Sequence, residues 1–131
     1  MGAKKLFLVD DDDIFRTAAE VLIKSQGLAE EVVQLENGLL AYNALVSLEN
    51  KPDELPEVMF LDINMPVMNG WELLEELKRA PQIIRSKVQI HILTSSIAPD
   101  DLNLSKTYGF INGYITKPLT NSDIEKIKMG L

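Results

Sequence analysis

The chain has 131 residues, of which 46% are hydrophobic and 25% are charged, and this length fits one domain. The absence of cysteine excludes thiol catalysis, Cys-ligated zinc and disulfide staples. With 20 acidic and 13 basic residues the net charge is −7, which disfavours direct binding to nucleic acid or to an anionic membrane. No apolar stretch approaches the length of a membrane span, so we expect a cytoplasmic protein with a single domain over residues 1–131 and no output domain.

Short apolar runs alternate along the chain with longer segments whose apolar residues recur at helical spacing. The runs predict five strands, at residues 6–9, 32–35, 58–61, 88–93 and 114–115. The first, third and fourth runs are apolar without interruption, which indicates strands buried on both faces, as in parallel sheets. The alternation therefore predicts an α/β fold with a doubly wound parallel sheet flanked by helices.

Apolar residues at helical spacing and capping signals predict five helices, which cover or start at residues 14–23, 39–48, 71–79, 99 and 120–122. Gly27 is expected to end the first helix, and Pro81 to end the third. The segment 50–56 contains two prolines and is predicted to be a solvated loop before the third strand.

Polar side chains follow four of the five apolar runs. The first run ends in aspartates 10–13, the third in Asp62, the fourth in Thr94 and Ser95, and the fifth in Lys117. In a doubly wound sheet, ligands bind beyond the carboxyl ends of the strands, where the strand order reverses. We therefore expect these side chains to converge on one crevice.

Three of these aspartates point to a metal ion. If Asp10, Asp11 and Asp62 converged, each pair would repel by about 4 kcal/mol at 4 Å and an effective dielectric of 20. A divalent cation removes this repulsion, and an all-oxygen site with few carboxylates suits Mg²⁺. Asp12 and Asp13 are better explained as a solvated helix N-terminus, with Asp13 as the N-cap.

The remaining polar groups suggest what the crevice does. Lys117 precedes a proline, so its backbone is extended or in a turn, and its ammonium can reach a phosphate or carboxylate. Thr94 supplies a hydroxyl at the neighbouring strand end. A carboxylate, a divalent metal, an ammonium and a hydroxyl together make a phosphoryl-transfer site, with Asp62 as the nucleophile that forms an aspartyl phosphate.

Several groups of residues match one known family in order and spacing, over nearly the whole chain. They are Leu8-Val9-Asp10-Asp11, Leu61-Asp62-Ile63-Asn64-Met65-Pro66 with Met68-Asn69-Gly70, Leu93-Thr94-Ser95, and Gly113-Tyr114 followed by Lys117-Pro118. The chain thus resembles the receiver domain of two-component response regulators, in a stand-alone, CheY-like form. The resemblance implies a (βα)5 flavodoxin-like fold with strand order 2-1-3-4-5.

The resemblance also implies a metal site and a phosphoacceptor. Asp62 would accept the phosphoryl group in a Mg²⁺-dependent reaction. The metal ligands would be Asp10, Asp11, Asp62 and the backbone carbonyl of Asn64. The phosphoryl donor would be a sensor histidine kinase or a histidine phosphotransfer protein. The protein would then signal to an unknown downstream protein as a monomer, or as a weak dimer once phosphorylated, and would not be an enzyme.

Further roles follow from the same resemblance. Thr94 and Lys117 would contact the phosphoryl group, and Lys117-Pro118 would be a cis peptide bond. Tyr114 would be an aromatic switch that follows Thr94 inward on phosphorylation. The single histidine, His91, falls inside the fourth predicted strand and is expected to have a structural role.

Two other readings of the same residues are open. A small haloacid dehalogenase-like phosphatase would use Asp10 as its nucleophile, because an apolar strand followed by Asp-x-Asp is the motif of that class, but it has no role for Asp62. A receiver-like adaptor that is never phosphorylated would have no reason to keep the mutually repelling carboxylates together. Mapping a phosphoryl label to Asp62 or to Asp10 separates the first reading from the receiver.

Overall fold

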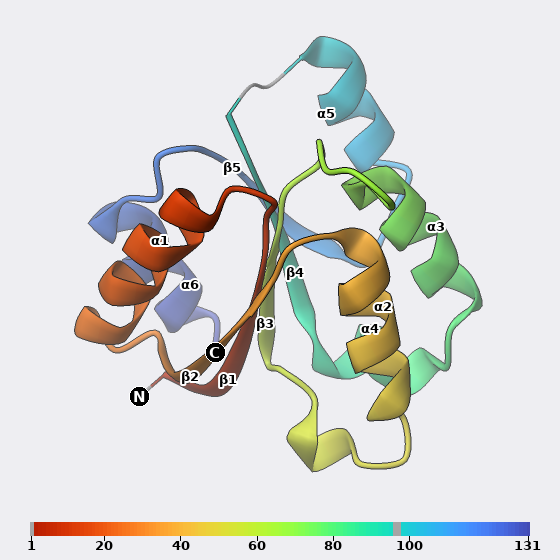
Figure 1. Ribbon diagram of the computed structural model, residues 1–131, viewed down its shortest axis with the longest axis horizontal. Helices are drawn as coiled ribbons and strands as arrows, with labels where there is room; N and C mark the ends of the chain where they lie inside the picture. The colour runs from red at the N-terminus through yellow and green to blue at the C-terminus, as the bar shows by residue number, and fades with distance from the viewer. Residues whose placement is uncertain (1, 96–97) are drawn as a thin grey trace.

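A computed structural model describes residues 2–95 and 98–131, and a five-stranded parallel sheet forms its centre (Figure 1). In chain order the strands are β1 (Ala3–Val9), β2 (Ala29–Leu35), β3 (Val58–Leu61), β4 (Gln89–Thr94) and β5 (Ile111–Thr116). Their order across the sheet is β2-β1-β3-β4-β5. The expected α/β fold and strand order are confirmed.

Helices cover both faces of the sheet (Figure 1). They are α1 (Asp13–Ser25), α2 (Gly38–Ser47), α3 (Gly70–Arg79), α4 (Gln82–Lys87), α5 (Pro99–Ser105) and α6 (Asn121–Met129). Successive side chains of a strand point to opposite faces, so β1 contributes to two cores. Leu6 packs in a cluster with Ile23 of α1 and Ile124 of α6, whereas Phe7 packs in a second cluster with Leu45 of α2 and Leu73 of α3.

β5 extends beyond the predicted strand at 114–115. Asn112 and Gly113 interrupt the apolar pattern of this segment, so the sequence shows only part of the strand. The ladder between β4 and β5 shifts register between Ile90 and His91. At this shift the Asn112 side chain accepts the Ile90 backbone N–H at 2.9 Å, in place of a backbone carbonyl. The side chain thus keeps a buried donor satisfied where the regular ladder fails.

The short helix α4 was not expected, because Pro81 reads in the sequence only as the end of α3. Pro81 in fact lies between the two helices and is the N-cap residue of α4. The Arg85 guanidinium donates to the backbone carbonyls of Leu77 and Ala80 where α3 ends, and the Leu77 carbonyl also accepts the Ala80 backbone N–H at 3.3 Å. α4 therefore completes the end of α3.

The prediction of a solvated loop over residues 50–56 is wrong in part. A 3-10 helix, η1 (Pro52–Glu54), lies within it, and Leu55 is buried in the core. Hydrophobic periodicity does not predict this contact, because a single buried leucine forms no repeating pattern.

Within the described residues, no helix is both long and apolar enough to span a bilayer.

The single histidine has a buried position in β4, as expected. His91 is 7% exposed and meets the Phe60 ring edge-on, with ring centroids 6.0 Å apart. It also lies against Gly113 of β5, where an added Cβ would be only 2.6 Å from its Nδ1. The glycine therefore makes room for the imidazole.

Burial lowers the pKa of His91 to about 4, so we expect His91 to make the protein less stable in acid. Between about pH 6.5 and 4 the unfolded chain binds this proton and the folded protein does not, so stability falls as the pH falls. The shift corresponds to roughly 3 kcal/mol. Denaturant unfolding of wild type and His91→Gln at pH 7 and pH 4 measures it, because carboxylates common to both proteins cancel in the difference. Equal losses of stability in the two proteins would contradict the expectation.

Candidate functional site

The first wall of the site forms where β1 ends and α1 begins. Asp10 is 2% exposed, and its Oδ1 accepts the Asp12 backbone N–H at 2.9 Å. The Asp12 side chain in turn accepts the N–H groups of Ile14 and Phe15 and is the N-cap of α1. The prediction of Asp13 as the cap is therefore wrong, since it is already the first helical residue. Asp11, between Asp10 and Asp12, is exposed.

The second wall forms where β3 ends. Asp62 is buried, and its Oδ1 accepts the backbone N–H of the next residue, Ile63, at 2.8 Å. α3 starts directly against this turn. A Cβ on Gly70 would be 2.6 Å from the Asp62 carbonyl oxygen, so only glycine fits. Asn64 lies two residues beyond Asp62 and is exposed.

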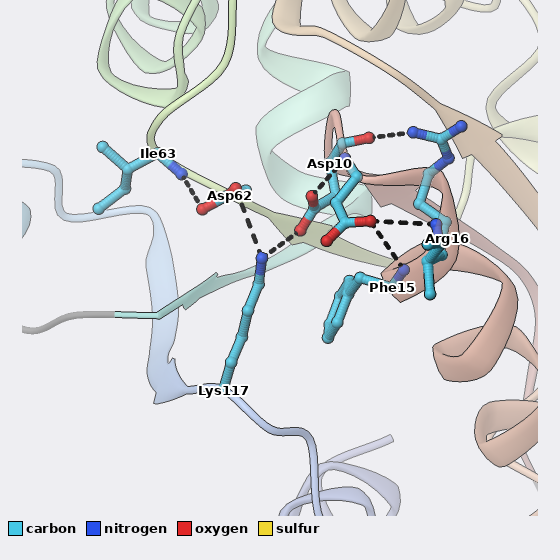
Figure 2. A network of polar contacts seen from close by, with 8 residues as sticks. Asp10, Phe15, Arg16, Asp62, Ile63 and Lys117 are labelled. Carbon is cyan, nitrogen blue, oxygen red and sulfur yellow. Dashed lines mark hydrogen bonds and ion pairs between the residues drawn. The ribbon is translucent and has the colours of Figure 1, made fainter.

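Lys117, which directly follows β5, reaches between these two walls (Figure 2). Its Nζ lies 2.6 Å from Asp10 Oδ2 and 3.5 Å from Asp62 Oδ2. Its backbone N–H donates to the Thr94 carbonyl at 2.7 Å, which fixes its position beside the end of β4. The Lys117-Pro118 peptide bond is cis, as expected.

The crevice holds more acidic side chains than basic ones, and their charges and burial shift the pKa values of Asp62 and Lys117. Burial, and then the negative charge of Asp10, raise the pKa of Asp62, although Lys117 acts in the opposite direction. Burial disfavours the Lys117 ammonium, but its hydrogen bond to Asp10 and the charges of both carboxylates outweigh this and raise its pKa. One ammonium thus lies beside the carboxylates of Asp10 and Asp62, with the Asp11 carboxylate close to both, so acidic groups outnumber the ammonium in the crevice.

The carboxylates are close enough to share one ion. Asp10, Asp11 and Asp62 each offer an oxygen, and these oxygens lie within 4.8 Å of one another. Carboxylate oxygens without sulfur or imidazole are the donors preferred by hard cations such as Mg²⁺. The donor set therefore fits a divalent metal.

Two further residues expected in the site lie on β4 and β5. Thr94 is buried at the end of β4, next to the Lys117 backbone. The Tyr114 ring on β5 is half-buried, and among the described residues its hydroxyl is the one buried side-chain oxygen or nitrogen without a hydrogen-bond partner. Burial and the negative charges of Asp101 and Asp62 raise the pKa of Tyr114.

Sequence reasoning missed two residues of α1 that touch the site. The Arg16 guanidinium donates to the Asp10 backbone carbonyl, and its Nε donates to Gln34 Oε1 of β2 at 3.1 Å. The Phe15 ring lies under the Lys117 ammonium, 4.2 Å from Nζ to the ring centroid. In the sequence Phe15 falls among the apolar residues at helical spacing that predict the first helix, over residues 14–23. A side chain at the very start of a helix that follows a strand end could also have been assigned to the crevice.

Comparisons with known proteins agree on one family. The family model of the response regulator receiver domain matches residues 6–128. The response regulator Rcp1 of Synechocystis is 30% identical over 131 residues, covering 98% of this chain and 86% of Rcp1. A crystal structure of a two-component response regulator from Cytophaga hutchinsonii covers both chains fully, with 28% identity and a TM-score of 0.88. The Mn²⁺-bound form of Rcp1 covers 97% of this chain and 90% of its own, with 30% identity and a TM-score of 0.72.

Proposed function

The chain belongs to the response regulator receiver domain family, and from this premise we propose that it accepts a phosphoryl group on Asp62 in a Mg²⁺-dependent reaction. Members of this family take part in two-component signalling and are not, in general, enzymes. The observation that carries the proposal is the place of Asp62, a buried carboxylate at a strand end with a lysine ammonium 3.5 Å away and two further carboxylates beside it. The relative Rcp1 has a Mn²⁺-bound form, which supports a divalent ion as the cofactor of this chain.

The donor would be a phosphohistidine on a sensor kinase or on a phosphotransfer protein. A carboxylate oxygen of Asp62 forms a bond to phosphorus as the bond from phosphorus to the donor nitrogen breaks. The imidazole leaves as the neutral ring when its other nitrogen carries a proton. The products are an aspartyl phosphate and a free histidine on the donor.

The surrounding groups stabilise the charge of the transferred phosphoryl. Lys117 donates from its ammonium, and Thr94 donates from its hydroxyl. Asp10, Asp11, Asp62 and the backbone carbonyl of Asn64 would hold Mg²⁺, which offsets the negative charge of the carboxylates and of the phosphoryl oxygens. The Arg16 guanidinium donates to the Asp10 backbone carbonyl and so helps to keep Asp10 in place.

Tyr114 would transmit the change to the surface. Its hydroxyl is buried without a partner, which is costly and leaves the ring ready to exchange one position for another. When Thr94 turns towards the phosphoryl group, the ring follows it inward and the surface around β5 changes. A downstream protein reads this two-state surface.

A small-molecule phosphodonor tests the proposal directly. We expect acetyl phosphate with Mg²⁺ to add one phosphoryl group to the intact protein, and omission of Mg²⁺ to prevent the addition. Borohydride reduction and peptide mapping would place the label on Asp62. A label on Asp10 would instead support the phosphatase reading, and no label at all would support an adaptor that works only by protein contacts.

A further inference from the structure

We propose that the Phe15 ring is a positioning group, which keeps the Lys117 ammonium beside Asp62 when a metal ion binds the carboxylates. This inference rests on the proposed function. Figure 2 shows Phe15 and Lys117 converging from different elements, α1 and the segment after β5. The distance of 4.2 Å from Nζ to the ring centroid lies well inside the roughly 6 Å range of a cation–π interaction.

Both partners are held in place by the backbone around them. The Phe15 N–H donates to the Asp12 side chain at 3.2 Å, so the N-cap of α1 fixes the start of the helix and the ring with it. The Lys117 N–H is bound to the Thr94 carbonyl. The Lys117 side chain is only 17% exposed, and a cation removed from water interacts more strongly with a π face.

The carboxylates that hold the ammonium are the same ones that would hold a metal. Asp10 Oδ2 is 2.6 Å from Nζ, and Asp10 also belongs to the group of three carboxylates. A divalent ion on these oxygens repels the ammonium and competes for its partners. The Phe15 ring is not subject to this competition, because hard cations take oxygen ligands. It therefore holds the ammonium in the crevice when the carboxylates are occupied.

An apolar packing role for Phe15 makes a different prediction. The ring packs at the edge of the cluster beneath α1 and α6, where any side chain of similar bulk would serve. Phe15→Leu and Phe15→Met keep apolar bulk and remove the π face, whereas Phe15→Tyr keeps both. Phe15→Leu and Phe15→Met should therefore preserve a packing role of Phe15 and abolish a cation–π role, whereas Phe15→Tyr should preserve both roles.

The test has two measurements on the full chain with saturating Mg²⁺. In ¹H–¹³C spectra, the Lys117 Hε protons should be shifted upfield by the ring in wild type and in Phe15→Tyr, and not in Phe15→Leu or Phe15→Met. The initial rate of labelling by acetyl phosphate should fall on the order of fivefold in Phe15→Leu and Phe15→Met. In Phe15→Tyr it should stay close to the wild-type rate.

Val21→Ala, an exposed apolar truncation on the same helix, is the matched control and should leave both measurements unchanged. Loss of the upfield shift in wild type when Mg²⁺ is added would overturn the proposal. So would wild-type labelling rates in both Phe15→Leu and Phe15→Met, or a Phe15→Tyr variant as slow as they are. If wild type is not labelled, the proposed function fails, while the Hε measurement still tests the position of the ammonium.

Discussion

Asp62→Asn should abolish labelling by acetyl phosphate and, at the same time, raise the melting temperature of the metal-free protein. Labelling is lost because an amide oxygen is a far poorer nucleophile than a carboxylate. Stability rises because burial and Asp10 raise the pKa of Asp62, so the charged form is disfavoured in the folded state. Wild-type stability therefore declines as the pH rises through this elevated pKa, and the variant lacks that decline.

Intact-mass spectrometry and thermal unfolding at pH 7 without Mg²⁺ measure the two effects. For a domain of this size, about 1 kcal/mol moves the melting temperature by about 4 °C. Asp53→Asn is the matched control, because Asp53 is an exposed carboxylate in η1, outside the crevice. Labelling of Asp62→Asn at the wild-type rate would disprove the assignment of the phosphoacceptor, and a lower melting temperature would disprove the electrostatic account.

Asp10→Asn should weaken Mg²⁺ binding at least tenfold, about 1.4 kcal/mol, while the fold persists. The variant removes one of the three carboxylates that offer oxygens to a metal. The amide oxygen still accepts the Asp12 N–H, so the turn into α1 is kept. The Lys117 ammonium loses its 2.6 Å partner and keeps Asp62 and the Phe15 ring.

Calorimetric titration with Mg²⁺ measures this loss. Asp12→Asn is the control, because it removes the same charge from the same run of aspartates at the helix cap, where asparagine caps equally well. Its Mg²⁺ affinity should stay within about twofold of wild type, since an exposed charge outside the site is screened. Equal weakening in both variants would indicate general attraction by the acidic run and not coordination by Asp10.

The sequence predicted the sheet and the convergence of its strand ends well, because both follow from simple geometry. A run such as 58–61 is buried on both faces and has little alternative to a central parallel strand. In a parallel sheet the carboxyl ends of the strands lie on the same side, so this side must carry Asp10, Asp62 and Lys117. Their proximity therefore required no knowledge of side-chain packing, and their chemical roles remain predictions.

The missed features depend on contacts between segments or on the exact turn. α4 is stabilised by Arg85 and the carbonyls of α3, a tertiary contact that propensity does not contain. The choice between Asp12 and Asp13 as cap depends on backbone angles at one residue. Phe15 is apolar and fits the core stripe, so only the position of Lys117 reveals its second contact.

Lys117 follows β5, which has a neighbouring strand on one side only. An edge strand is hydrogen-bonded to one neighbour and a central strand to two, so we expect β5 to open locally before β1 and β3, which present Asp10 and Asp62. In such a partly opened state Asp10 and Asp62 would stay in place, and the Lys117 ammonium would move away from them. A phosphoryl group held between Asp62 and Lys117 would join the edge of the sheet to its centre, so the occupied site would slow amide hydrogen exchange in β5.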